Sequence, residues 1–188
     1  MTIEDRQLTF LALLEPHRNA LWRFVRSMSR STTEAEDLFG ETVLQAWEGF
    51  HRLRDEQAFV SFVFTIASRL QKRHRWRSAL FGTYDEEAAH ETPHSDPLPD
   101  AQADVEYLRC CLLKLPAAVR EAVVLFDVLG LSLEEVRTIQ GGTLSGVKSR
   151  LKRGRERLAT MLEADIEHVP SNVSAPRLTI ARIPGPTP

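Results

Sequence analysis

Residues 132–158, SLEEVRTIQGGTLSGVKSRLKRGRERL, decide the fold class of the C-terminal half of the chain. Ser132 followed by Glu135 is a capping box that opens a short helix, and Gly141-Gly142 then makes a turn. Thr143 is a suitable N-cap for a longer helix whose apolar residues recur along one side. A short helix, a glycine turn and a longer helix are the layout of a helix-turn-helix.

The longer helix is strongly basic. Between Lys148 and Arg157 it carries six basic side chains and one acidic side chain. The apolar stripe leaves most of these cations on the outer faces, where they suit a major groove and its phosphates. The alternative is a solvated helix face, which is common for a run of charges. Because the preceding helix and turn match the motif, the sequence favours contact with duplex DNA.

Helical periodicity also runs through the N-terminal half of the chain. Pro16 is expected to separate a short opening helix from a longer one, and Ser31 with Glu34 forms another capping box. No alternation typical of strands competes with this pattern. The sequence therefore predicts an all-α protein with two small helical domains, the second containing the helix-turn-helix.

A second basic cluster ends the N-terminal half. Its cations are interleaved with aromatic residues, which suits melted DNA because phosphates are neutralised while bases stack. The alternative is a solvated helix end that is placed favourably for the helix dipole. The cluster consists of Arg69, Lys72, Arg73, His74, Arg75 and Arg77, with Trp76 and Phe81 between and beyond them.

Charge and proline divide the chain into parts. The 188 residues carry a net charge of −2, yet residues 83–104 hold seven acidic side chains and no lysine or arginine. Such a segment buries too little apolar surface to order itself, so we expect a flexible acidic linker there. The Pro-rich stretch 169–188 is expected to be a disordered tail. Two folded domains remain, at residues 1–82 and 105–168.

Several protein classes are excluded by composition. A spanning helix needs ~20 mostly apolar residues, whereas no unbroken apolar run here, Ala122 to Phe126 included, is longer than five. The N-terminus lacks a signal-peptide pattern, so the chain is expected in the cytoplasm without membrane insertion. Adjacent Cys110 and Cys111 suit neither an ordinary disulfide nor a metal knuckle. No nucleophile triad, phosphate loop or metal spacing occurs, so we expect neither an enzyme nor a cofactor.

The order of these motifs resembles the extracytoplasmic-function (ECF) sigma factors of bacterial RNA polymerase, over about residues 8–163. Residues 34–47 resemble the polymerase-binding helix of that family, and residues 59–70 resemble its promoter-melting helix. Three further segments resemble the second DNA-binding domain of that family, namely 115–125, 130–136 and 147–158.

The resemblance implies a transcription initiation subunit that has no catalysis of its own. Such a subunit binds the β and β′ subunits of core RNA polymerase, recognises the −35 promoter element as duplex and captures a melted −10 element. An anti-sigma factor is a further expected partner. Residues 1–82 correspond to the polymerase-binding and −10 domain, and residues 105–168 correspond to the −35 domain.

The resemblance also implies which residues make the contacts. Polymerase contacts are expected at Asp37, Leu38, Glu41 and Trp47. Contacts to the −10 element are expected at Arg52, Arg54, Gln57, Arg69, Lys72, Arg73, Arg75 and Trp76. Contacts to the −35 element are expected at Thr143, Ser145, Lys148, Ser149, Arg150, Lys152 and Arg153.

The helix-turn-helix departs from the family pattern at its turn. Arg137, Gln140 and Gly142 stand where the family shows a small residue and two apolar residues. Gly146 and Gly154 lie inside the recognition helix, where each costs ~1 kcal/mol relative to alanine. We therefore expect a marginally stable −35 domain. Combining Arg137→Ala, Gln140→Leu and Gly142→Ile is expected to raise its melting temperature.

A stand-alone helix-turn-helix regulator, which binds duplex DNA without polymerase, is the alternative function. Such a regulator has no need of Asp37, Glu41 and the basic-aromatic helix end together. The N-terminal motifs therefore favour a sigma factor.

Overall fold

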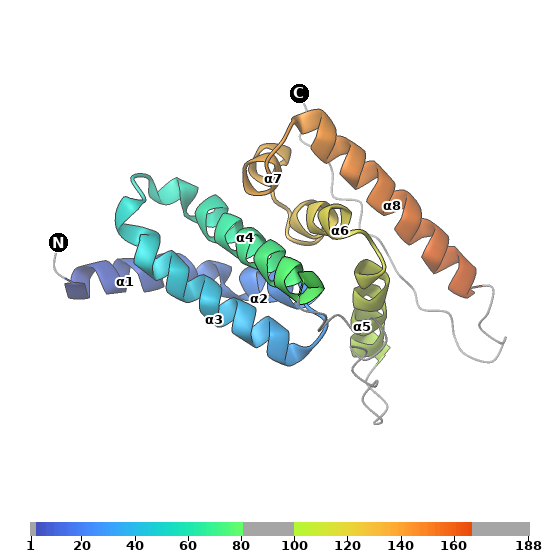
Figure 1. Ribbon diagram of the computed structural model, residues 1–188, viewed down its shortest axis with the longest axis horizontal. Helices are drawn as coiled ribbons and strands as arrows, with labels where there is room; N and C mark the ends of the chain where they lie inside the picture. Colours follow the sequence, from blue (N-terminus) through green and yellow to red (C-terminus); the bar gives the residue numbers. More distant parts are fainter. Residues whose placement is uncertain (1–2, 81–99, 167–188) are drawn as a thin grey trace.

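The computed structural model describes residues 3–80 and 100–166, and within these residues it contains helices and turns but no strand (Figure 1). The N-terminal unit, residues 3–80, consists of α1 (Ile3–Leu14), α2 (Arg18–Met28), α3 (Thr32–Gly49) and α4 (Phe59–Leu80). The C-terminal unit, residues 100–166, consists of α5 (Asp100–Leu113), α6 (Ala117–Val123), α7 (Leu133–Gln140) and α8 (Leu144–Ile166). The all-α prediction is confirmed. The expected acidic linker and tail lie largely outside the described residues.

Local signals set the helix boundaries of the N-terminal unit. Pro16 lies in a 3-10 turn, Glu15–His17, which separates α1 from α2 as expected. The Ser31 hydroxyl accepts a hydrogen bond from the Glu34 amide at 3.1 Å and so caps α3. The Glu34 carboxylate accepts from the backbone N–H of Arg30 rather than from that of Ser31, so only half of the expected capping box forms.

The helix-turn-helix forms as predicted. Ser132 and Glu135 make both hydrogen bonds of a capping box, so α7 begins at Leu133. Gly141 ends α7 with a φ of 79°, a left-handed conformation that glycine adopts at little steric cost. The Thr143 hydroxyl accepts from the Gly146 amide at 3.1 Å and caps α8.

The structure accommodates the three residues of the turn that depart from the family pattern. Gly142 has a φ of 90°, which disfavours the β-branched residues of the family pattern. The Gln140 amide nitrogen donates to the Ala118 carbonyl at 3.0 Å and to the Glu121 carboxylate at 2.8 Å, so this nitrogen has two partners. Arg137 is exposed and pairs with Glu134 at 2.8 Å. These departures are accommodated by backbone conformation and hydrogen bonds.

Gly154 is a packing residue. It is buried where α8 crosses α6, and a Cβ at this position would lie 2.4 Å from Val123 Cγ2. The same Cβ would lie 3.1 Å from Val119 Cγ1. The absence of a side chain therefore lets the two helices approach closely, which offsets the lower helix propensity of glycine.

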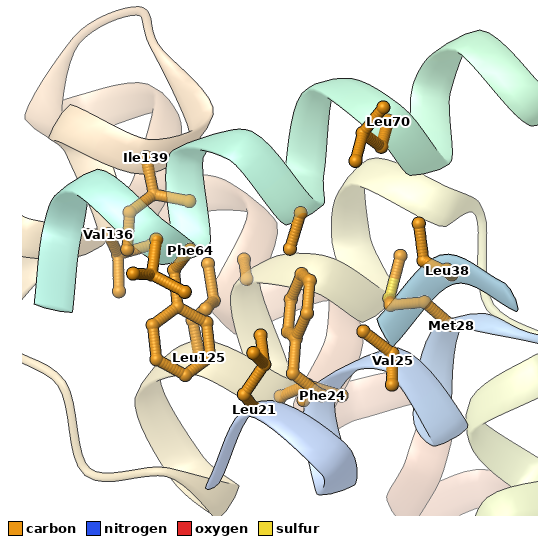
Figure 2. Close-up of a cluster of buried hydrophobic side chains, with 14 of the residues drawn as sticks. Leu21, Phe24, Val25, Met28, Leu38, Phe64, Leu70, Leu125, Val136 and Ile139 are labelled. Atoms are coloured by element: carbon orange, nitrogen blue, oxygen red, sulfur yellow. The ribbon is translucent and has the colours of Figure 1, made fainter. Parts of the chain in front are cut away.

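The two units share one hydrophobic core. A single cluster of buried side chains includes Phe24, Phe64 and Leu70 from the N-terminal unit and Leu125, Val136 and Ile139 from the C-terminal unit. Helix α7 packs against α4, and α5 and α6 contact α2. Figure 2 shows Val136 and Ile139 of α7 beside Phe64 of α4. The sequence predicted two domains joined by a tether. The structure adds that their apolar faces are covered by each other.

Replacing Gly154 by alanine tests the close approach of α6 and α8. Overpacking costs about 1–3 kcal/mol and the gain in helix propensity returns at most about 1 kcal/mol, so we expect Gly154→Ala to lower the free energy of unfolding by about 1–2 kcal/mol. Urea unfolding of the full chain, followed by circular dichroism, measures it. Gly40→Ala is the matched control. Nothing lies within 4 Å of a Cβ at Gly40, so it should raise stability.

Replacing Gly142 by isoleucine tests the turn. At a φ of 90° the β-branched side chain strains the backbone, so Gly142→Ile should lower the melting temperature, at a cost of roughly 1–2 kcal/mol. Gly142→Asn is the control, because asparagine tolerates left-handed conformations and should lose less. A higher melting temperature for the isoleucine variant would show that the turn has an apolar gap after all.

Candidate nucleic-acid interface

The N-terminal half of α8 presents one exposed polar face. Ser145, Lys148, Ser149 and Lys152 are all exposed and follow the i, i+3, i+4, i+7 spacing of a single helix side. Val147 and Leu151 are buried on the opposite side, against α6 and α7. Thr143 and Arg153 are also exposed. The sequence-predicted −35 residues are thus brought together, with Arg150 as the exception.

Arg150 and Arg155 have structural partners. Arg150 is half-buried and donates from Nη2 to the Gly141 carbonyl at 3.4 Å, which ties α8 to the turn. Arg155 donates from Nε to Asp127 at 3.1 Å and lies 5.4 Å from the centre of the Phe126 ring. The hydrogen bonds that Arg155 donates to the Asp127 carboxylate raise the pKa of Arg155. Part of the basic run therefore holds α8 on the residues that follow α6.

The basic end of α4 is exposed. Arg69, Arg73, Arg75 and Arg77 are exposed, and the Trp76 side chain is 65% exposed among them. Neither Arg69 nor Arg75 has an ion-pair partner within the described residues. Exposed cations beside an exposed indole ring can neutralise phosphates and stack bases. Lys72, by contrast, is half-buried against the C-terminal unit.

The connection between α3 and α4 carries three further expected −10 residues. Arg52, Arg54 and Gln57 are all exposed. The Asp55 carboxylate accepts a hydrogen bond from the backbone N–H of Gln57 at 2.9 Å, which fixes the turn that precedes α4. This loop therefore presents its polar side chains to solvent next to the start of α4.

The residues expected to contact polymerase differ in their exposure to solvent. Asp37 is exposed on α3. Leu38 is only 2% exposed and belongs to the core, so it presents almost no surface for a contact in this conformation. Trp47 is half-buried. Its ring lies 5.5 Å from that of Phe10, and the Arg6 guanidinium lies 4.4 Å above it. Trp47 thus anchors α1 to α3 and presents only part of its surface.

Glu41 has partners on α4 that sequence spacing did not reveal. One carboxylate oxygen accepts from Arg73, and the other lies 2.7 Å from Nε2 of His74. Gln45 also donates to Glu41 at 3.4 Å. The carboxylate is therefore paired within the chain, and its contact with polymerase stays a prediction. Arg73, expected at −10 DNA, is its partner.

The described residues hold no cluster suited to a metal ion. No three His, Cys, Asp or Glu side chains converge within 3–80 and 104–163. Cys110 and Cys111 are free thiols, the second of them buried. In the same part of the chain, no helix has the length and apolar character that crossing a membrane requires.

Both halves of the chain match known families. Residues 13–79 match Sigma-70 region 2, and residues 105–158 match Sigma-70, region 4. The chain is 30% identical to the RNA polymerase sigma factor CnrH of Cupriavidus metallidurans, over 86% of this chain and 90% of that relative. It is 31% identical to the ECF RNA polymerase sigma factor EcfG of Rhodopseudomonas palustris, over 78% of this chain and 81% of that relative.

Solved structures are similar over both units. The sigma factor RpoE in complex with the anti-sigma factor NepR from Bartonella quintana has a TM-score of 0.66 and 27% identity, over 87% of this chain and 99% of that chain. CnrH in complex with the cytosolic domain of CnrY shares the fold, with a TM-score of 0.65 and 24% identity. Since the two family matches together span more than half of the chain in the expected order, the chain belongs to the ECF sigma factors of RNA polymerase.

Proposed function

We propose that this sigma factor uses three separate surfaces to direct promoter-specific initiation by core RNA polymerase. The exposed side of α3 around Asp37 binds polymerase. The basic end of α4 and the loop 52–57 bind the melted −10 element, and the N-terminal half of α8 binds the −35 duplex. The observation that carries the proposal is the coexistence of the α4 and α8 surfaces on one chain that matches regions 2 and 4.

The two DNA surfaces have different chemistry. On α4, the exposed Trp76 ring lies among arginines, which suits unpaired bases and a single-stranded backbone. On α8, short hydroxyl side chains alternate with lysines on a slim helix face, which suits a major groove. We assign base selection at −10 to Arg52, Arg54 and Gln57, because they lie on a fixed loop next to the cations of α4.

The proposed tasks are divided between the two domains of the chain. We assign polymerase binding and −10 capture to residues 1–82 and −35 recognition to residues 105–168. The chain itself performs no catalysis in this scheme, and it works in the cytoplasm, where polymerase acts. The alternative, a stand-alone helix-turn-helix regulator, accounts for the C-terminal unit alone and leaves the region 2 match without a role.

We also assign an anti-sigma factor as a partner. Two solved structures that resemble this chain are complexes of a sigma factor with NepR or with the cytosolic domain of CnrY, and both likenesses extend over both units. Co-purification of the tagged full chain from cells, with and without an excess of core polymerase, tests this partner. The anti-sigma factor and core polymerase should exclude each other from the chain.

Asp37 tests the polymerase surface. Asp37→Asn removes an exposed charge from the proposed interface, so affinity for core polymerase should fall about threefold to tenfold with unchanged helicity. Glu41→Gln should weaken core binding less, because the Glu41 carboxylate is already occupied by Arg73 and His74. Titration of core polymerase with labelled chain measures both affinities. Core affinity that is unchanged in Asp37→Asn contradicts the assignment.

Charge reversal on α4 tests the −10 surface. Arg69→Glu with Arg75→Glu should reduce open-complex formation on many promoters alike, because phosphate contacts position the protein without reading sequence. Exchanging residues 52–57 for the loop of another ECF sigma factor should instead change which −10 sequence is preferred. Permanganate footprinting of melted thymines separates the two effects.

A matched control for this experiment is Arg18→Glu with Arg23→Glu. Both arginines are exposed on α2, outside the proposed surface, and the change in net charge is the same. The control should retain wild-type footprints. If the α4 variant also retains them, the phosphate contacts lie elsewhere.

A further inference from the structure

A 3-10 turn, Phe50–Arg52, follows α3 directly. The Phe50 side chain is 7% exposed, and its ring packs edge-on against those of Phe10 and Phe59. These aromatic contacts anchor the backbone of the turn on the hydrophobic core. His51 and Arg52 consequently have a fixed backbone, while their side chains are exposed.

The His51 ring is oriented by the last turn of α3. Its Nδ1 lies 2.8 Å from the Glu48 carbonyl oxygen. A carbonyl oxygen only accepts hydrogen bonds, so Nδ1 carries the hydrogen that is donated. In a neutral imidazole the other nitrogen, Nε2, then keeps a lone pair and acts as an acceptor. The contact with α3 therefore defines the tautomer of the neutral His51 ring.

Arg52 donates to this lone pair. Its Nε lies 3.4 Å from Nε2 of His51. Because Nε–H is engaged, the hydrogens on Nη1 and Nη2 remain for other groups, and within residues 3–80 Arg52 has no ion pair. These hydrogens form a fork that binds two neighbouring acceptor atoms in one plane. The contact with His51 thus leaves the outer end of the guanidinium available in a defined orientation.

Arg52 also forms one wall of a small hollow on the surface. Gln45, Glu48 and Gly49 of α3 form the remaining walls, and the hollow has a volume of about 240 Å³. An exposed arginine that lacks partners samples many rotamers, and ordering it costs entropy when a ligand binds. A contact that holds Arg52 beforehand therefore favours binding at this place and sets the shape of the hollow.

Protonation of the His51 ring reverses this contact. Histidine changes its charge between about pH 5 and 8. A second hydrogen on Nε2 removes the lone pair and places a positive charge beside the Arg52 guanidinium, so the two groups repel. Glu48 is the acidic residue one turn earlier, and the carbonyls at the end of α3 also favour a charged ring. Phe10 and Phe59, which anchor the turn from α1 and α4, contribute no charge.

We propose that His51 is a positioning residue for recognition of the −10 element. Its neutral ring fixes Arg52 through Nε, and the Nη1/Nη2 fork of Arg52 then binds two neighbouring acceptors on the melted strand. Such acceptors occur on the O6/N7 edge of guanine and on a phosphate group. The proposal rests on the proposed −10 role of Arg52 and adds His51, a residue outside the expected −10 contacts.

Nuclear magnetic resonance of the free full chain tests the contact itself. At pH 7.5 the ring nitrogens of His51 should show the Nδ1–H tautomer. Carbon-detected relaxation of nitrogen-15 should show that Nε of Arg52 is more ordered than Nε of Arg54, which is also exposed. The two arginines should become alike at pH 6.0, and in His51→Ala they should be alike at pH 7.5 as well.

Selection of open complexes tests the consequence for DNA. Holoenzyme is formed from the full chain and core polymerase, and the promoters are randomised over the −10 element. His51→Ala should weaken the preference at one −10 position about threefold at pH 8.0, a modest effect because the contact is exposed. The wild-type chain should lose the same preference at pH 6.0.

Two further variants separate positioning from a general effect of pH. His51→Gln places an amide oxygen near the position of Nε2, and this oxygen does not titrate, so the variant should keep its preference at both pH values. His17→Gln is the matched control. His17 lies in the turn before α2, and this variant should follow the wild-type chain at both pH values.

The outcomes separate the positioning role of His51 from the proposed function. A selective loss for guanine assigns the Arg52 fork to a base. An equal loss for all −10 sequences assigns it to a phosphate, which supports positioning and overturns base selection by Arg52. Arg52 that is equally ordered with and without His51, or a His51→Ala chain that selects promoters like the wild-type chain, overturns the positioning role. An ordered Arg52 in a chain that opens no promoter overturns the proposed function alone.

Discussion

The burial of Phe64 between α2 and α7 is the constraint on which the arrangement of this molecule depends. Phe64 belongs to the core of the N-terminal unit through Phe24, and it belongs to the interface through Val136 and Ile139. Because these side chains form one cluster, neither unit covers its apolar surface alone in this conformation. The surfaces that remain for polymerase and DNA are those that this packing leaves outside.

Cations in this chain serve both the fold and the proposed interfaces. Arg73 pairs with Glu41, Lys72 pairs with Glu121, and Arg155 pairs with Asp127. Each pair joins two different helical segments, so each orients a basic helix relative to its neighbour. The Arg73 and Arg155 pairs are partly exposed on both sides, and pairs of this kind contribute only modestly to stability. The same charges can therefore position α4 and α8 before DNA binds.

The departures of the helix-turn-helix from its family pattern have physical reasons. Gln140 has an amide rather than an apolar side chain because the Glu121 carboxylate and the Ala118 carbonyl lie within its reach. Gly142 adopts a left-handed backbone, and Gly154 gives α8 room beside Val123. A pattern that looks destabilising when it is compared position by position is consistent once the neighbours from other helices are known.

The sequence by itself determined the helices, their boundaries and the family. Periodicity, the Ser132 capping box, Pro16 and the glycine turn act within a few residues of each other, so they can be identified along the chain. The basic helices indicated two DNA surfaces, and the resemblance of the ordered motifs to ECF sigma factors implied a polymerase subunit. The exposed positions on α8 followed from its apolar stripe.

The tertiary structure alone decided which of these residues are free to act. Leu38 is buried, and Glu41 and Lys72 are paired with residues far along the sequence. Likewise, the docking of α7 on α4 requires that two apolar faces meet, and periodicity shows that each face exists but not which partner covers it. The physical reason is that burial and ion pairing depend on distances in space, whereas sequence patterns report only the neighbours within one or two helical turns.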